Sequence, residues 1–164
     1  MEYAGFLETP LGLLGISCTE DALIGIDWIT AAHVQAKKPI TAIAKEVILQ
    51  LQTYFCDGSH IFDLPLSLSG TIHQQQVWDL LRSVPVGNTL FYGDLARQLS
   101  SSPRAVGNAC RHNPIPIVVP CHRIIAKSGI GGYSGHLSGP VQGFKRWLLQ
   151  HEAHACRHKT KLLP

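Results

Sequence analysis

The sequence predicts an α+β protein in which a small N-terminal lobe, with an antiparallel sheet and one helix, precedes a mainly helical C-terminal lobe. Three observations predict this class. Apolar, strand-like runs flank a polar turn near the N-terminus, one helical stripe follows, and from residue 71 onward apolar side chains recur at helical spacing. The 164 residues, 45% hydrophobic and 15% charged, suit a globular domain with room for a small second lobe.

The N-terminal lobe begins with a predicted hairpin, because Leu11–Ile16 and Leu23–Ile29 are apolar runs separated by a turn. Thr41 is placed to cap a helix that Gly58 ends. Residues 61–66 predict a short extended segment, and small polar residues then mark the boundary between the lobes. The stripe of the helix repeats at helical spacing through Ile43, Val47, Leu51 and Tyr54 or Phe55.

The C-terminal lobe, expected over residues 71–164 after an N-terminal lobe over 1–70, opens with a capping box at Thr71 and Gln74. Two short helices follow, at Tyr92–Leu99 and Pro103–His112, and the second starts well because serine caps and proline suits the first turn. The pair resembles a helix-turn-helix of the winged-helix kind, although a plain helical hairpin fits the pattern equally well.

The end of the lobe combines a buried-looking run, a long loop and a last helix. Ile115–Val119 is apolar and β-branched and leads into Cys121. Glycines recur between residues 129 and 143 and mark the loop. The closing helix carries Phe144, Trp147 and Leu148 on its inner face.

Charge is distributed unevenly along the chain, whose formal net charge is +3. Residues 1–70 carry eight acidic and three basic side chains, whereas residues 97–161 carry ten basic side chains and one acidic side chain, Glu152. The second half is therefore the expected surface for a polyanion. On charge alone, a solvated basic face explains the same pattern equally well.

The five cysteines are odd in number, and neither a signal peptide nor a long apolar span accompanies them. This favours free thiols, a reducing, cytoplasmic setting and no membrane attachment. The final His151, His154, Cys156 and His158 are best explained as a frayed polar terminus, since no second cluster completes a metal site.

Cys121 is the candidate nucleophile, because it ends a buried-looking run and is followed by His122 and Arg123. A thiol needs a base or nearby positive charge to react at neutral pH. On an extended strand the two side chains point oppositely, so His122 reaches the Cys121 thiol only at a sharp turn or through a water. On local grounds alone, such a pair is more often structural than catalytic.

The motif Pro120-Cys121-His122-Arg123 resembles the active-site signature of the O6-alkylguanine-DNA alkyltransferases. The resemblance covers residues 74–152, and residues 1–70 fit only loosely through Thr9-Pro10-Leu11-Gly12. The matching segments, in the family's order, are Val77-Trp78, Pro85 with Gly87, Tyr92-Gly93-Asp94-Leu95-Ala96, Arg104-Ala105-Val106-Gly107, Asn113-Pro114, Gly132-Tyr133-Ser134-Gly135 and Trp147-Leu148-Leu149 with Glu152.

The resemblance implies that the chain moves a methyl or larger alkyl group from O6 of guanine, and from O4 of thymine, onto Cys121 and is inactivated. His122 would take the thiol proton through a water, and Glu152 would orient His122. Tyr92 would donate to N3 of guanine, and the backbone at Ser134 would bind O6. The carbonyls of Cys121 and Ile124 would bind the exocyclic amine of guanine, and Asn113 would hold the turn that leads to the Cys121 region. The implied substrate-binding residues are Tyr92, Asn113, Pro116, Cys121, Ile124, Tyr133 and Ser134.

The implied partner is double-stranded DNA containing O6-alkylguanine, bound by a monomer, and cooperative binding along the DNA is left open. A thiol cannot reach O6 inside the base stack, so the nucleotide must be flipped out. Arg104 would fill the gap from the minor groove, where small side chains let the helix approach closely. The implied DNA contacts are Arg104, Ala105, Gly107, Arg111 and Arg123.

Three departures from the family pattern qualify the resemblance. The turn between the two short helices is about two residues shorter, and the loop after Ser134 is longer, with Gly135–Pro140 beside the pocket. Cys18 and His33 lack convincing partners, so no zinc and no cofactor are expected. Three alternatives remain: an alkyltransferase-like binding module, against which Cys121 argues; a cysteine hydrolase, which would turn over repeatedly; and a transcription regulator, for which the chain is too short.

Overall fold

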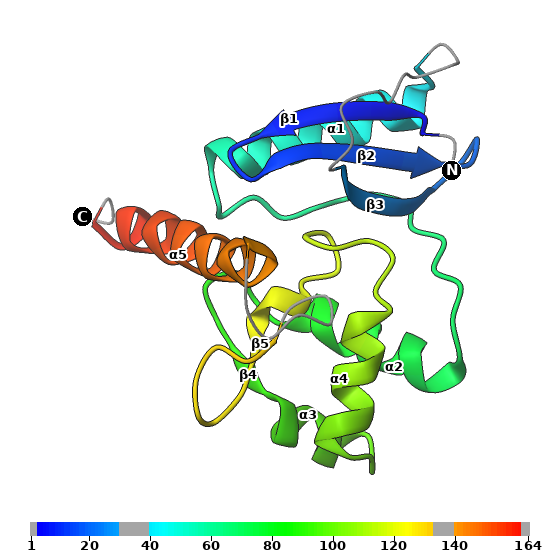
Figure 1. The fold of residues 1–164 in the computed structure, drawn as a ribbon. Coiled ribbons are helices and arrows are strands. Elements are labelled where there is room, and N and C mark those ends of the chain that lie inside the picture. Colours follow the sequence, from blue (N-terminus) through cyan, green and yellow to red (C-terminus); the bar gives the residue numbers. More distant parts are fainter. Residues whose placement is uncertain (1–2, 30–39, 133–139, 162–164) are drawn as a thin grey trace.

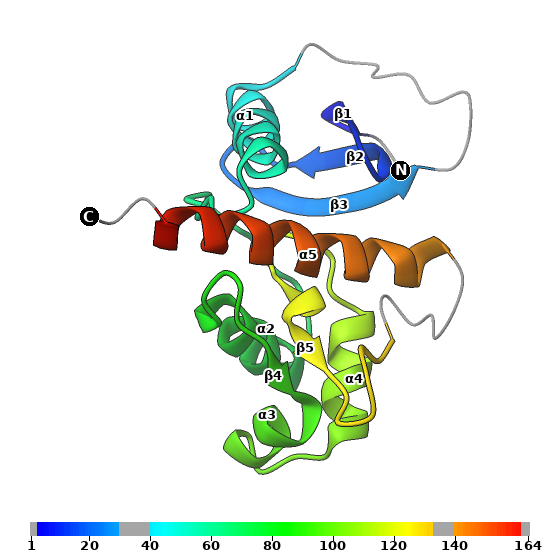
Figure 2. The same ribbon diagram turned by 90° about the vertical axis from the view of Figure 1, so that its left-hand side faces the viewer.

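The computed structural model describes residues 3–29, 40–132 and 140–161, and the side chains of 142–156 within the last range. It confirms the α+β class. Figure 1 shows the sheet of β1, β2 and β3 with α1 at one end of the molecule and α2, α3 and α4 at the other. Figure 2 shows the last helix, α5 (Pro140–Lys161), lying between these two groups. Within the described residues, no helix is long and apolar enough to cross a membrane.

The N-terminal sheet is antiparallel in the order β1-β2-β3, with β1 at Gly5–Thr9, β2 at Gly12–Cys18 and β3 at Leu23–Ile29. The predicted hairpin is therefore confirmed as β2 and β3. Strand β1 was not predicted, because its five residues, GFLET, are too few to show an alternating apolar pattern. Its turn into β2 needs a left-handed residue, and Gly12 supplies it with φ +112°.

Helix α1 (Ala42–Cys56) packs on this sheet, and its buried residues are Ala44, Val47, Leu51 and Tyr54. The predicted cap is confirmed, since the Thr41 hydroxyl accepts from the N–H of Ala44 at 3.2 Å. The helix ends at Cys56, with Asp57 as its C-cap, two residues before the predicted stop. Residues 61–66 are extended but pair only through Leu66, which bridges to Leu23 of β3.

The C-terminal helices are α2 (Ile72–Ser83), α3 (Tyr92–Gln98) and α4 (Pro103–Arg111). The capping box of α2 is confirmed in both directions, and the Ser102 hydroxyl caps α4 at 3.2 Å from the N–H of Ala105. The indole of Trp78, only 1% exposed, donates to the carbonyl of Ala109 at 2.9 Å and fastens α2 to α4. A short parallel pair, β4 (Leu90–Phe91) with β5 (Ile124–Ile125), lies beside them.

Helix α5 corrects the prediction of a frayed polar terminus. The helix continues through His151, His154 and Cys156 to Lys161. Tertiary contacts hold it: the His151 ring stacks on Trp147 at 4.7 Å and bonds the carbonyl of Tyr54 at 2.6 Å. Helical stability comes mainly from such packing, which a polar composition does not reveal.

Candidate active site

The chain turns sharply at Cys121, which is one of the two arrangements expected from the sequence for His122 to reach the thiol. Ile115–Val119 is buried but is not a strand, since its backbone folds back with the N–H of Val119 on the carbonyl of Ile115 at 2.9 Å. Ile117 adopts φ +75°, which a β-branched residue adopts only when its surroundings impose it. Cys121–Arg123 then forms a single 3-10 turn. Pro116, an implied substrate contact, is buried inside this structure.

Asn113 joins the end of α4 to the nucleophile. Its Nδ2 donates to the carbonyl of Val119 at 2.8 Å and to Sγ of Cys121 at 3.3 Å, while its Oδ1 accepts from the N–H of Ile115 at 3.0 Å. A donor aimed at sulfur stabilises the thiolate more than the thiol. The side chain therefore both shapes the turn and favours the reactive form of Cys121.

Replacing Asn113 by alanine is expected to slow alkylation of Cys121 about tenfold and to lower the free energy of unfolding by about 1–3 kcal/mol, because Ile115 and Val119 lose their partners. Single-turnover rates and urea unfolding measure the two effects. Asn108→Ala, at an exposed position on the same helix, is the control. An Asn113→Ala chain that loses stability but keeps the wild-type rate would make Asn113 a purely structural residue.

His122 is fully buried and faces Glu152, with 2.7 Å between Nε2 and Oε1. Burial lowers the pKa of His122, as do the nearby charges of Arg123 and Lys145, and together they outweigh the opposing effect of Glu152. The ring is therefore neutral at neutral pH. With Nε2 donating to the carboxylate, Nδ1 carries the free lone pair, and it has no hydrogen-bond partner among the described residues. This is the form of histidine that accepts a proton.

Glu152 is 1% exposed and receives hydrogen bonds from several elements. Its Oε1 accepts from Tyr54 at 3.0 Å, from His122, and from Nη2 of Arg123 at 2.9 Å. Its Oε2 accepts from Nε of Arg123 at 3.0 Å and from the N–H of Gly87 at 3.3 Å. Burial alone raises the pKa of this carboxyl, but His122 and Arg123 overcome it and lower the pKa to about 2. Glu152 is thus a permanently charged, fixed acceptor.

The structure contradicts the expectation that Arg123 contacts DNA. Its side chain is buried, forks onto Glu152, and donates from Nη1 to the carbonyl of Val84 at 2.6 Å. A buried cation must be paired, and this one has its partner inside the protein. Position in a basic stretch of sequence suggested a surface residue, because sequence alone does not show which side of the turn faces inward.

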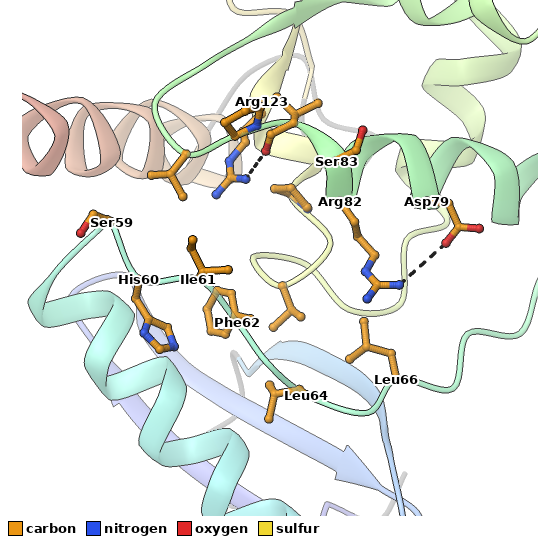
Figure 3. Close-up of a pocket in the computed structure, with 15 residues that line it drawn as sticks. Ser59, His60, Ile61, Phe62, Leu64, Leu66, Asp79, Arg82, Ser83 and Arg123 are labelled. Atoms are coloured by element: carbon orange, nitrogen blue, oxygen red, sulfur yellow. Dashed lines mark hydrogen bonds and ion pairs between the residues drawn. The ribbon is translucent and has the colours of Figure 1, made fainter.

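Arg123 also lines a pocket of about 520 Å³ (Figure 3). Its walls come from residues 59–66, the end of α2 and the segment 84–86. The labelled Arg82 pairs with Asp79 at 3.8 Å, and Arg123 bonds the backbone of Val84, so these polar groups are already satisfied. Neither Cys121 nor Tyr92 lines this pocket, which is therefore not the site of the chemistry.

Tyr92 and Lys145 lie together beside Cys121. The Tyr92 hydroxyl donates to the carbonyl of Gly132 at 3.4 Å, and its ring lies 3.9 Å from where a Cβ on Gly107 would stand. Nζ of Lys145 donates to the carbonyls of Ile124 and Gly132 at 2.6 and 2.9 Å and lies 5.7 Å from the Tyr92 ring centre. Burial raises the pKa of Tyr92.

Lys145 is a site residue that the sequence argument missed. It is fully buried, and burial lowers its pKa to about 8, although the nearby Cys121 and Cys110 oppose the shift. The carbonyls of Cys121 and Ile124 were expected to bind the exocyclic amine of guanine. In the structure the carbonyl of Ile124 accepts a hydrogen bond from the Lys145 ammonium group, and the carbonyl of Cys121 accepts one from the N–H of Ile124. The available signal was spacing, since residues 145 and 152 are two helical turns apart and share a face of α5.

The implied DNA contacts other than Arg123 lie on α4. Arg104 and Arg111 are exposed near its two ends, and Ala105 and Gly107 are half-buried between them. The tight turn before α4 holds Ser100 in the left-handed region at φ 49°, and Ser101 is bonded to His73 at 2.8 Å. Tyr133, Ser134 and the loop 135–139 lie outside the described residues. In the ranges 3–29, 40–132 and 140–161, no cluster of metal-ligating side chains is found.

Comparison with known proteins identifies relatives along almost the whole chain. Residues 73–154 match the family described as 6-O-methylguanine DNA methyltransferase, DNA binding domain, and residues 3–68 match its ribonuclease-like domain. The methylated-DNA--protein-cysteine methyltransferase, constitutive, of Bacillus subtilis is 41% identical over 148 residues, which are 82% of this chain and 88% of the relative. That of Shigella flexneri is 36% identical over 90% of this chain and 94% of the relative.

Solved structures agree with these relatives. The Mycobacterium tuberculosis OGT in complex with DNA is 34% identical, with a TM-score of 0.77 over 92% of both chains. The O6-methylguanine-DNA methyltransferase of Pyrococcus kodakaraensis is 26% identical, with a TM-score of 0.54 over 85% of this chain and 90% of the other. With the buried Cys121, His122 and Glu152 in the matched region, the chain belongs to the 6-O-methylguanine DNA methyltransferase family.

Proposed function

We propose that this chain repairs double-stranded DNA by transferring an alkyl group from O6 of guanine to Sγ of its own Cys121. The observation that carries the proposal is the buried hydrogen bond between His122 and Glu152 next to a cysteine that already receives an N–H from Asn113. The relatives named methylated-DNA--protein-cysteine methyltransferase, and the OGT solved with DNA, support the same activity.

The reaction is a displacement in which the Sγ–carbon bond forms as the carbon–O6 bond breaks. The thiol proton passes to Nδ1 of His122 through a bridging water, and Glu152 stabilises the resulting imidazolium. The departing guanine takes the bond's electron pair, and Tyr92 donates a hydrogen bond or proton at N3. Lys145 is charged when the pH is below about 8, and its Nζ lies 5.7 Å from the centre of the Tyr92 ring, where it makes a cation–π contact. Backbone groups near Ser134 and Tyr133 bind O6.

DNA binding is assigned to α4, in the minor groove. Arg104 fills the place of the flipped nucleotide, Ala105 and Gly107 permit a close approach, and Arg111 contacts the phosphate backbone. The proximity of the Tyr92 ring to Gly107 of α4 supports this, because the residue proposed to bind guanine then lies next to the helix proposed to bind DNA.

One chain is expected to repair one lesion, because the thioether formed on Cys121 is chemically stable. With duplex O6-methylguanine in excess over protein, the yield of repaired DNA should stop at one equivalent and be absent in Cys121→Ala. Repeated turnover would instead favour a cysteine hydrolase. The same titration with O4-methylthymine in the duplex tests whether that base is also a substrate.

A further inference from the structure

The N-terminal lobe sends one side chain directly to the carboxylate that orients His122. Tyr54, in the last turn of α1, is fully buried, and its hydroxyl donates to Oε1 of Glu152 at 3.0 Å. The same oxygen faces His122. Tyr54 and Glu152 are 98 positions apart in the sequence. The carbonyl of Tyr54 also binds His151, one position before Glu152 on α5. Tyr54 therefore forms hydrogen bonds with two adjacent residues of α5.

The surroundings of Tyr54 hold its ring in place and keep its hydroxyl protonated. Aromatic rings of Phe55, Phe62 and His151 lie 5.4–5.6 Å from the Tyr54 ring and fix its orientation. Burial raises the pKa of Tyr54 well above its ordinary value, and the charge of Glu152 adds to the rise. The phenol is thus always protonated and always a donor. A buried tyrosine hydroxyl normally has such a partner, but here the partner belongs to the site of the chemistry.

We propose that Tyr54 is a positioning residue of the alkyl transfer, whose hydroxyl limits how strongly Glu152 holds a proton on His122. The inference rests on the proposed function, since it gives a role within that relay to the N-terminal lobe. Its consequence is that the N-terminal lobe tunes the chemistry at Cys121 and does more than complete the fold.

The charged and titratable groups around this carboxylate come from each element packed against it. Arg123 and His122 contact it from the 3-10 turn, which also carries Cys121. The segment after α2 contributes the N–H of Gly87. On α5, the charge of Lys145 acts on His122, His151 bonds the carbonyl of Tyr54, and Cys156 lies beside Gly87. Tyr54 is the donor from α1. Each donor other than His122 compensates part of the negative charge that would otherwise stabilise an imidazolium.

Removing the hydroxyl should therefore raise the pKa of His122. A histidine must be neutral to act as base, so the acid limb of the rate profile should move to higher pH. In Tyr54→Phe we expect a shift of about half a pH unit, since one hydrogen bond among several is lost. A purely structural role would lower thermal stability and leave this limb in place.

The test compares Tyr54→Phe with Tyr3→Phe across pH, using the rate at which free O6-benzylguanine alkylates Cys121. Tyr3 is a matched control, because it lies in the same lobe and packs on Phe6 with its hydroxyl near Asp27, away from Glu152. Tyr3→Phe should follow the wild-type profile. Superposable profiles for all three chains would overturn the proposal.

A titration by NMR separates this proposal from the proposed function. In a Cys121→Ser chain, which cannot be alkylated, the imidazole of His122 should titrate at higher pH when Tyr54 is phenylalanine. In a chain that also carries Glu152→Gln, the Tyr54 substitution should add no shift. An unchanged His122 pKa, or an equal shift without the carboxylate, contradicts the role of Tyr54 even if Cys121 is the acceptor. If Cys121 is never alkylated, the proposed function fails while this titration still decides the contact.

Discussion

Glu152→Gln should slow alkyl transfer to Cys121 tens-fold or more at neutral pH, because an amide cannot stabilise the imidazolium that forms on His122. Part of the rate should return at higher pH, where hydroxide ionises the thiol directly. Stopped-flow or quench measurements with free O6-benzylguanine give the rate without contributions from DNA binding. A wild-type rate at neutral pH would leave Glu152 structural and assign activation to His122 alone.

The same substitution should also cost stability, which the sequence did not suggest. If Glu152 were a surface residue, replacing it would have little effect on folding. Because Glu152 is buried, glutamine at this position leaves the buried Arg123 without a counter-charge. Breaking a buried pair in this way costs about 3–5 kcal/mol. Leu148→Ala is the matched control, since Leu148 is fully buried on the same helix and its truncation costs about 2–5 kcal/mol. That variant should melt early and still react at the wild-type rate.

The pH dependence of stability gives an independent check on the Glu152 carboxylate. Its pKa is about 2 in the folded chain against 4.5 for the free group. A lowered carboxyl pKa stabilises the fold at pH values above the free value, and the contribution is lost as the pH falls from about 4.5 through about 2. Urea midpoints of the wild type and Glu152→Gln should therefore converge across this range.

Arg104→Ala should slow repair of duplex DNA by about a hundredfold, while leaving the reaction with free O6-benzylguanine nearly unchanged. Only the duplex requires unstacking, which costs a few kcal/mol, and each 1.4 kcal/mol is about a factor of ten. Arg104 is exposed in the first turn of α4 and makes no contact with the buried relay.

Arg82→Ala provides the comparison for Arg104, because Arg82 is also an exposed arginine but lies on α2 beside Asp79 and the pocket of Figure 3. It should affect neither substrate. Equal losses on duplex and free base in Arg104→Ala would show that Arg104 supports the fold or the chemistry and does not replace a flipped nucleotide.

The parts of the fold that the sequence predicted are those decided by neighbouring residues. Thr41, Thr71 and Ser102 each cap a helix within three positions of themselves, so the pattern alone identifies them. The turn at Cys121 was less accessible to prediction, because β-branched residues favour a strand. Here the side chain of Asn113 bonds Ile115 and Val119, and the backbone between them folds back in a compact turn instead.

The site was predicted where the family motif supplied it and missed where burial decided the outcome. His122 and Glu152 meet across 30 positions, and periodicity does not connect them. Arg123, Lys145 and Tyr54 are ordinary surface or core residues by type, and their roles arise only when three separate elements converge on one carboxylate and one loop. Polar side chains buried by such convergence leave no local signature in the sequence.

The assignment of Cys121 as the alkyl acceptor is tested most directly by the mass of the protein after reaction with duplex DNA that contains O6-methylguanine. We expect a gain of about 14 Da, one methylene, located by peptide mapping on Cys121. The other four thiols, including the buried Cys110, should stay unmodified. Repaired DNA with an unmodified protein, or a methyl group on Cys110 or another cysteine, would contradict the assignment of Cys121 as the acceptor.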